Sequence, residues 1–202
     1  MKNKVRVLSP SMKEVQEDCT KWAAEIAQSF RPDIVVFIAK SGFLFAEPIA
    51  QYFGCTMADV TVKRPGDKAR DSLKKIFRFV PKFVWSAYVR MSLGYNDKHT
   101  ERLFIPGRKF QAINLADYRN ILLVDDSADT GSSIIKAVDE LRKFAPDSVI
   151  KTCCYCVISL SMKRVRVDYF RHMDTVIFTG TSRYSEEYPE FLRRLKEWES
   201  MD

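Results

Sequence analysis

The sequence lacks several features that would assign it to a large class of proteins. Its 202 residues contain no apolar run as long as a membrane span. The basic start of the chain is followed by polar residues rather than by the apolar core of a secretory signal. No internal repeat and no low-complexity tract occurs, which disfavours a repeat protein or a disordered chain. We therefore expect a cytoplasmic globular protein.

Side chains that form metal sites and disulfides are also scarce. The chain has two histidines, His99 and His172, and five cysteines, three of which crowd together at 153–156. The cysteines do not have the Cys-x-x-Cys spacing of a zinc site, and both histidines lie far from the cluster in sequence. An odd number of cysteines also argues against a disulfide framework. Small apolar positions in a buried strand fit these thiols better.

Positive charge is abundant but local. The stretch 63–109 holds thirteen Lys and Arg and four acidic residues, a net charge of +9, whereas the rest of the chain carries −2. Such a region could steer a polyanionic substrate, lie on an anionic membrane or meet nucleic acid. We favour the first use over contact with a membrane or nucleic acid.

Apolar runs of strand length alternate with helix-like segments along the chain. Ser11 and Glu14 form a capping-box pattern that predicts a helix over 11–30. The run 34–39 predicts a strand that is buried on both faces. This alternation predicts the α/β class, with an open, mostly parallel sheet flanked by helices. The other predicted elements are a turn at 40–42, a helix to 52, strands at 55–63, 121–124, 150–159 and 175–178, a helix at 133–144, and a C-terminal helix from about 189.

The most informative segment is 121–133, with the sequence Ile-Leu-Leu-Val-Asp-Asp-Ser-Ala-Asp-Thr-Gly-Ser-Ser. Four aliphatic residues predict a buried strand, and a hydroxyl-rich turn with Gly131 then leads into a helix. Amides and hydroxyls at a helix start favour a phosphate. Asp125 and Asp126 would repel that phosphate, so they should face hydrogen-bond donors such as a sugar diol, or a divalent cation. A ligand with a ribose and a phosphate meets both demands.

At these residues the chain resembles the type I phosphoribosyltransferases. Their signature is an aliphatic strand, two acidic residues, two variable residues, then Asp-Thr-Gly and a hydroxyl residue. The resemblance implies binding of phosphoribosyl pyrophosphate, a Mg²⁺ cofactor and transfer of ribose 5-phosphate to a base. It also implies one domain over 1–202 with a C-terminal hood and helix at 160–202.

The resemblance also assigns roles to residues by position. Asp125 and Asp126 would hold the ribose hydroxyls and the metal. Asp129 would contact the base and assist proton transfer, so the three acids are the candidate catalytic residues. The 5-phosphate cradle would consist of Asp129, Thr130, Gly131, Ser132 and Ser133. The pyrophosphate site would consist of Lys40, Ser41 and Gly42, with a cis peptide between Lys40 and Ser41. An ordinary strand-to-helix turn is the alternative for 40–42.

Base recognition is the weakest part of the resemblance. Purine-using members place a lysine near the strand after the signature helix and stack an aromatic residue on the ring. Here Lys163 comes late, and Phe178 or Tyr184 is the candidate for stacking. A core role for Phe178 is an open alternative.

The interval 64–111 holds basic and aromatic residues in unusual number. We predict a basic helical insertion there, with two short helices over 67–94, interrupted by Pro81. These helices would pack on the core or form a contact in a homodimer, or, less favoured, rest on a membrane. The mobile loop that closes over the site in this family would be 95–111. Its cations Arg102, Arg108 and Lys109 could neutralise the departing pyrophosphate.

The sequence therefore predicts a Mg²⁺-dependent phosphoribosyltransferase acting on a base of the hypoxanthine, guanine and xanthine class. Two alternatives remain: a regulatory protein that binds the sugar phosphate without turnover, and a transferase with a non-purine acceptor. The strand at 121–124 also resembles the first strand of a receiver domain of phosphorelay proteins. That interpretation gives Asp129, Thr130 and Gly131 no role and leaves the first 120 residues unexplained.

Overall fold

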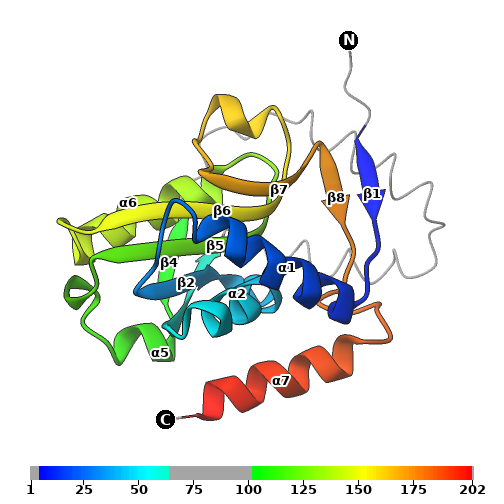
Figure 1. Ribbon diagram of the computed structural model, residues 1–202, viewed down its shortest axis with the longest axis horizontal. Helices are drawn as coiled ribbons and strands as arrows, with labels where there is room; N and C mark the ends of the chain where they lie inside the picture. Colours follow the sequence, from blue (N-terminus) through cyan, green and yellow to red (C-terminus); the bar gives the residue numbers. More distant parts are fainter. Residues whose placement is uncertain (1–4, 64–101, 202) are drawn as a thin grey trace.

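The computed structural model describes residues 5–63 and 102–201. The two helices predicted over 67–94 lie outside the described residues. The main sheet has six strands in the order β4-β3-β2-β5-β6-β7, all parallel except β4, which runs antiparallel to β3 (Figure 1). The strands are β2 (Ile34–Ile38), β3 (Thr56–Lys63), β4 (Leu103–Pro106), β5 (Asn120–Ala128), β6 (Val149–Val157) and β7 (Tyr169–Met173). The predicted fold class is confirmed.

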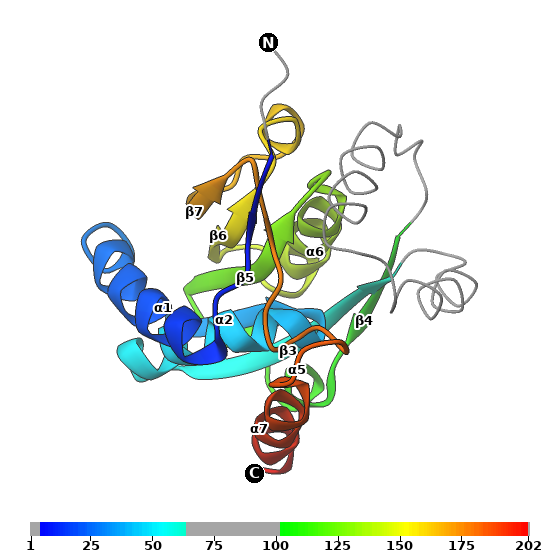
Figure 2. The same ribbon diagram turned by 90° about the vertical axis from the view of Figure 1, so that its right-hand side faces the viewer.

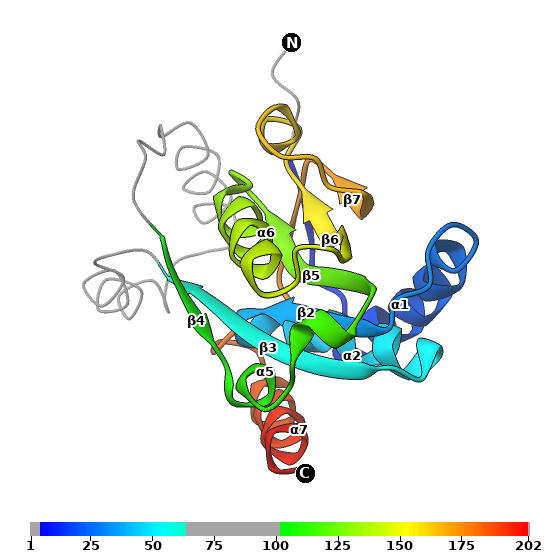
Figure 3. The same ribbon diagram turned by 90° about the vertical axis from the view of Figure 1, so that its left-hand side faces the viewer.

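Helices cover both faces of this sheet (Figure 3). One core packs the sheet against apolar side chains of α1 (Met12–Ile26), α2 (Ala39–Phe53) and α7 (Tyr188–Ser200). The other core lies beneath α6 (Ser132–Phe144), with Phe110 of α5 (Arg108–Gln111) and Leu115 of the short helix η2 (Leu115–Asp117). Because both faces are covered, all five residues of β2 are buried.

The local signals in the sequence explain where α1 begins. Ser11 is its N-cap and exchanges hydrogen bonds with Glu14, so the predicted capping box is confirmed. The helix ends at Ile26, short of the predicted residue 30, because 27–29 form a turn ahead of Pro32.

The strand order reverses between β2 and β5. The chain passes from β2 to β3 on one side, then crosses to β5 on the other side of β2. Ligands of open α/β sheets bind at such a switch point, beyond the carboxyl ends of the strands. The fold therefore places the segments after β2 and after β5 at one site.

Strand β5 is longer than predicted. It pairs with β2 as far as Val124, but it stays paired with β6 as far as Ala128. Asp125 and Asp126 therefore lie on the strand rather than after its end. Since β2 has already given way to α2 at Ala39, this last part of β5 has no strand beside it on the β2 side.

A second, two-stranded sheet joins the two ends of the chain. Strand β1 (Arg6–Leu8) pairs in parallel with β8 (Thr175–Ile177), and the two lie beside the main sheet (Figure 2). Strand β8 was predicted, whereas β1 and β7 were not. Within the predicted hood, β7 instead forms an edge of the main sheet.

The part of the predicted mobile loop that the structure describes has regular structure. Residues 103–106 form β4, and 108–111 form α5. This part of the loop prediction is wrong, because the ladder with β3 satisfies the backbone of β4. Across the described ranges, no helix is both long and apolar enough to cross a membrane.

Candidate functional site

A cavity of about 220 Å³ opens at the switch point. It brings together the start of α2 and the β5–α6 connection, to which the family resemblance assigned the pyrophosphate and the 5-phosphate. The described residues that line it are Ile38, Ala39, Ser41, Val62, Arg102, and all residues from Asp125 to Ile134.

Two adjacent carboxylates form one wall of the cavity. Asp125 is 6% exposed, and its Oδ1 accepts a hydrogen bond of 2.9 Å from the backbone N–H of Asp126. Burial, and then the neighbouring Asp126 carboxylate, raise the pKa of Asp125 well above its usual value. Asp126 is half-buried, and its Oδ1 lies 3.4 Å from the Ser127 hydroxyl, which donates to it. The pair thus combines a buried carboxyl group that favours protonation with a more accessible one.

The opposite wall is the start of α6. Gly131 is the N-cap residue and has a left-handed backbone, with φ of 76°. Because glycine has no side chain, the N-cap offers no oxygen of its own to the amides of the first turn. The hydroxyls of Thr130 and Ser132 lie 3.0 Å apart at the same point. Amides and hydroxyls gathered at a helix N-terminus form an anion site, which supports the predicted cradle.

A side chain at Gly131 should destabilise the fold. A Cβ at this residue would lie 2.3 Å from Cγ1 of Val165, and its φ strains any other residue. We expect Gly131→Ala to lower the free energy of unfolding by about 2–5 kcal/mol, from backbone strain and overpacking together. Urea unfolding measures the loss.

Gly54→Ala is the matched control for Gly131→Ala. Gly54 has a similar φ of 64°, but a Cβ there meets nothing within 4 Å. The control should therefore lose only the strain part, about 1–2 kcal/mol. Equal losses in the two variants would contradict the contact between Gly131 and Val165.

The structure revises the predicted pyrophosphate turn. Residues 40–42 lie in the first turn of α2, and no cis peptide occurs in the described residues, so the predicted cis bond is wrong. The chain bends instead at Ala39, whose φ is 55°. Strained backbone at a non-glycine residue is frequent at functional sites.

Of the three residues predicted to bind pyrophosphate, only Ser41 lines the cavity. Lys40 is exposed, and Gly42 is buried with Phe37 and the carbonyl oxygen of Val124 beside it. A Cβ at Gly42 would lie 3.3 Å from each of them. Gly42 thus permits close packing of α2 on the sheet.

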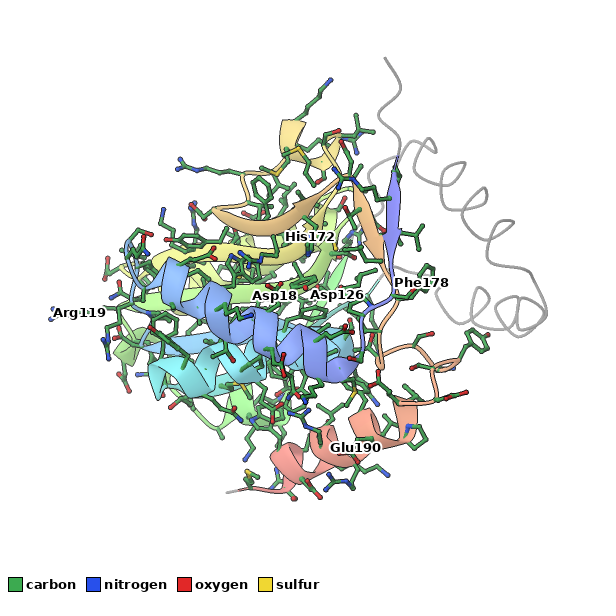
Figure 4. The ribbon with its side chains drawn as sticks, turned by 45° about the vertical axis from the view of Figure 1, so that its right-hand side comes forward. Asp18, Arg119, Asp126, His172, Phe178 and Glu190 are labelled. Atoms are coloured by element: carbon green, nitrogen blue, oxygen red, sulfur yellow. The ribbon has the colours of Figure 1, made fainter. Side chains whose placement is uncertain are left out.

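The candidate base-binding residues lie outside the cavity lining. Lys163 is exposed at the end of the short helix η3 (Ser161–Lys163). Phe178 is half-buried directly after β8, and its backbone N–H donates to the Leu8 carbonyl oxygen (Figure 4). Tyr184 is 55% exposed.

The sequence did not predict where two polar residues that line the cavity would lie. Ser127 lies inside the signature, but its position was treated as variable. Arg102 was assigned to the pyrophosphate from charge alone, whereas its Nη1 donates a hydrogen bond of 2.9 Å to Oγ of Ser133, in the cradle. No local signal places Arg102, because its position depends on the pairing of β4 with β3.

The donor groups suit a metal ion that arrives with a substrate. In the described ranges no group of three or more His, Cys, Asp or Glu side chains is placed to hold a metal ion. Mg²⁺ often binds through one or two carboxylates together with phosphate oxygens of a substrate. Asp125 and Asp126 offer such a partial set. The half-buried Asp126 would be the better ligand of the two, since burial favours the protonated form of Asp125.

A larger cavity, of about 610 Å³, lies between α1, α2 and α7. Its charged side chains are paired with each other: Arg194 with Glu47, and Arg193 with Glu190 and Glu197. Mutual pairing of this kind serves packing of α7, so we assign no ligand to this cavity.

Comparisons with known proteins concern the family and the fold of this chain. The sequence matches the family described as phosphoribosyl transferase domain over residues 11–186. A search of curated proteins gave no match. Similar solved structures include a purine phosphoribosyltransferase from Pyrococcus horikoshii, with 17% identity, a TM-score of 0.56, and coverage of 86% of this chain and 91% of that chain.

Two other solved structures cover nearly the whole chain. The xanthine-guanine-hypoxanthine phosphoribosyltransferase of Helicobacter pylori has 12% identity and a TM-score of 0.58, with coverage of 96% and 99%. A hypothetical protein from Neisseria gonorrhoeae with bound ppGpp has 12% identity and a TM-score of 0.55, with coverage of 97% and 99%. At these identities the likeness concerns the fold. The family match spans most of the chain, and this protein belongs to the phosphoribosyl transferase domain family.

Proposed function

We propose that this protein transfers ribose 5-phosphate from phosphoribosyl pyrophosphate to a purine-like base of the hypoxanthine, guanine and xanthine class, with release of pyrophosphate. One observation carries the proposal. A pair of carboxylates, Asp125 and Asp126, and a phosphate cradle at 130–133 line the same cavity. A ribose phosphate has a diol and a phosphate with that arrangement.

The size of the cavity supports a sugar phosphate as its occupant. Its volume of about 220 Å³ is below the roughly 300–1,000 Å³ typical of pockets for drug-sized ligands. In this proposal the described residues would enclose the ribose phosphate part of the substrate. The base and the pyrophosphate would extend beyond them.

Breaking the bond between C1 of the ribose and pyrophosphate develops positive charge on the sugar. Catalysis then depends mainly on positioning and on electrostatic stabilisation. Asp125 and Asp126 would fix the ribose through its hydroxyls, and the cradle would fix the phosphate. Asp129 is exposed at the cavity and would take a proton from the incoming base. Mg²⁺, held by Asp126 with Asp125, would neutralise the leaving pyrophosphate.

Support for a purine-like acceptor comes from the solved structures. The proteins from P. horikoshii and H. pylori are named as phosphoribosyltransferases of purine bases. Lys163 and Phe178 lie outside the cavity lining, so neither of these two described residues supports the choice of base. The acceptor is therefore the part of the proposal that most needs an experiment. The homodimer and the cytoplasmic location stay predictions.

Incubation with phosphoribosyl pyrophosphate, Mg²⁺ and a panel of bases tests the proposal. The panel includes hypoxanthine, guanine, xanthine, adenine, uracil and orotate, and release of pyrophosphate is measured. We expect release with at least one of the first three bases and none without a base. Turnover with a pyrimidine alone would assign a non-purine acceptor.

A second candidate function is regulatory binding without turnover. The N. gonorrhoeae structure contains ppGpp, which shows that a protein of this fold can bind a polyphosphorylated nucleotide. Tight binding of phosphoribosyl pyrophosphate with no pyrophosphate release from any acceptor would support this candidate. The acids at 125, 126 and 129 favour catalysis instead, because the first two suffice to hold the ribose, whereas Asp129 adds a carboxylate that could take a proton from the base.

A further inference from the structure

Arg102 reaches the cavity because of the way β4 pairs with β3. The two strands are antiparallel, and Leu103 pairs with Lys63, the last residue of β3. Arg102 therefore lies just past the end of this ladder, beside the carboxyl end of β3. Since β3 is parallel to β2, that is the edge of the sheet at which the cavity opens.

The guanidinium of Arg102 contacts the cradle. Its Nη1 donates a hydrogen bond of 2.9 Å to Oγ of Ser133, the second residue of α6. Among the described residues that line the cavity, Arg102 carries the one positive side chain, beside three carboxylates. Lys40, the cation expected here from the sequence, is not in the lining.

The Arg102 guanidinium could balance the negative charge of a phosphate bound in the cradle. The N-terminus of a helix supplies about half a positive charge, which falls short of balancing a phosphate dianion that sits close to three carboxyl groups. A guanidinium adds a full positive charge, and its fork of N–H donors matches two phosphate oxygens. A phosphate bound at the amides and hydroxyls of Ser132 and Ser133 would lie within reach of that fork.

We propose that Arg102 binds the 5-phosphate of the sugar substrate and selects phosphorylated over unphosphorylated ribose. The inference rests on the proposed function and adds to it a specificity-determining residue outside the signature. It replaces the expectation, drawn from charge alone, that Arg102 neutralises pyrophosphate. The pairing of β4 with β3 thereby contributes directly to substrate binding.

Calorimetry with two separate probes, ribose 5-phosphate and inorganic pyrophosphate with Mg²⁺, tests the inference. We expect Arg102→Gln to weaken the binding of ribose 5-phosphate about tenfold or more, because a charge-assisted contact is lost. The affinity for pyrophosphate should not change. Arg102→Lys keeps the charge but not the fork, so it should fall between. Arg142→Gln, at the far end of α6, removes the same charge and should behave as the wild type.

Kinetics separates a binding role from a structural one. The 5-phosphate is remote from the bond that breaks, so Arg102→Gln should raise KM for phosphoribosyl pyrophosphate while kcat changes little. Unchanged affinity for ribose 5-phosphate in Arg102→Gln, or a larger loss for pyrophosphate, would overturn the inference and leave the proposed function standing. Failure of the wild type to bind either phosphoribosyl pyrophosphate or ribose 5-phosphate would overturn both.

Discussion

Asp126→Asn is expected to weaken binding of ribose 5-phosphate by about 10- to 100-fold, because hydrogen bonds to a charged group contribute about 1.5–3 kcal/mol. Asp126 is half-buried on the last part of β5, where no strand pairs with its β2 side. The substitution keeps its size and leaves the core alone. The melting temperature should therefore stay within a few degrees of the wild-type value.

A sugar that lacks the 2-hydroxyl tests whether the carboxylates bind that hydroxyl. Wild-type protein should prefer ribose 5-phosphate to 2-deoxyribose 5-phosphate, and Asp126→Asn should lose most of this preference. Calorimetry with both sugars measures it. Asp139→Asn is the control, because it removes an exposed carboxylate from the neighbouring helix α6. An unchanged preference in Asp126→Asn would contradict the assignment of Asp126 to the ribose.

Asp125→Asn is expected to have opposite effects on binding and on stability. Binding of ribose 5-phosphate should fall, but by less than in Asp126→Asn, because burial favours the uncharged form of Asp125 and its contact to a hydroxyl is less charge-assisted. Stability should rise by about 1–3 kcal/mol above neutral pH, the range for relief of a poorly compensated buried polar group. Asparagine can still accept the hydrogen bond from the Asp126 N–H that Asp125 now accepts.

The pH dependence of this effect has a definite sign. Burial raises the pKa of Asp125, so at mildly acidic pH the unfolded chain has lost this proton and the folded chain retains it. The wild type therefore loses stability as the pH rises from the usual carboxyl range toward the raised pKa. The asparagine of the variant has no proton to lose, so this loss should be absent from Asp125→Asn. Urea unfolding of both proteins at a series of pH values measures the difference.

Identical pH profiles for the wild type and Asp125→Asn would show that Asp125 ionises in the fold as it does in the unfolded chain. Such a result would contradict the expectation that Asp125 lowers the stability of the fold while it serves ligand binding. A gain in stability together with lost binding would instead show that Asp125 is kept for the ligand at a cost to the fold.

The acids and the phosphate cradle could be predicted from the sequence because the signals for them are local. One segment holds the aliphatic residues before Asp125, the glycine at 131 and the amphipathic helix that follows. Their order predicts a buried strand, then the acidic residues, then the phosphate cradle. The capping box at Ser11 was also readable from adjacent residues. Predictions of this kind depend on short-range geometry, and the structure confirms the fold class that they imply.

The features that sequence reasoning missed depend on long-range pairing. The length of β5 is set by β6, which continues beside it beyond Val124. The place of Arg102 is set by the register of β4 on β3. Strand β1 exists because β8, near the other end of the chain, pairs with it. None of these partners can be recognised from the residues on either side of them in sequence.

The turn after β2 shows a different limit. The expectation of a cis peptide came from the resemblance to the family rather than from the residues. In this chain the bend is made by a positive φ at Ala39, a conformation that alanine seldom adopts and that nothing in the sequence indicates. Only the coordinates of the backbone reveal such a bend.

A crystal structure with ribose 5-phosphate shows most directly whether the carboxylates hold the ribose and the cradle holds the phosphate. We expect the phosphate on the backbone amides of 131–133 and on the Arg102 guanidinium. We also expect both ribose hydroxyls within about 3.2 Å of oxygens of Asp125 and Asp126. A sugar bound in the reverse orientation, or a phosphate held outside the cavity between β5 and α2, would rule out this arrangement.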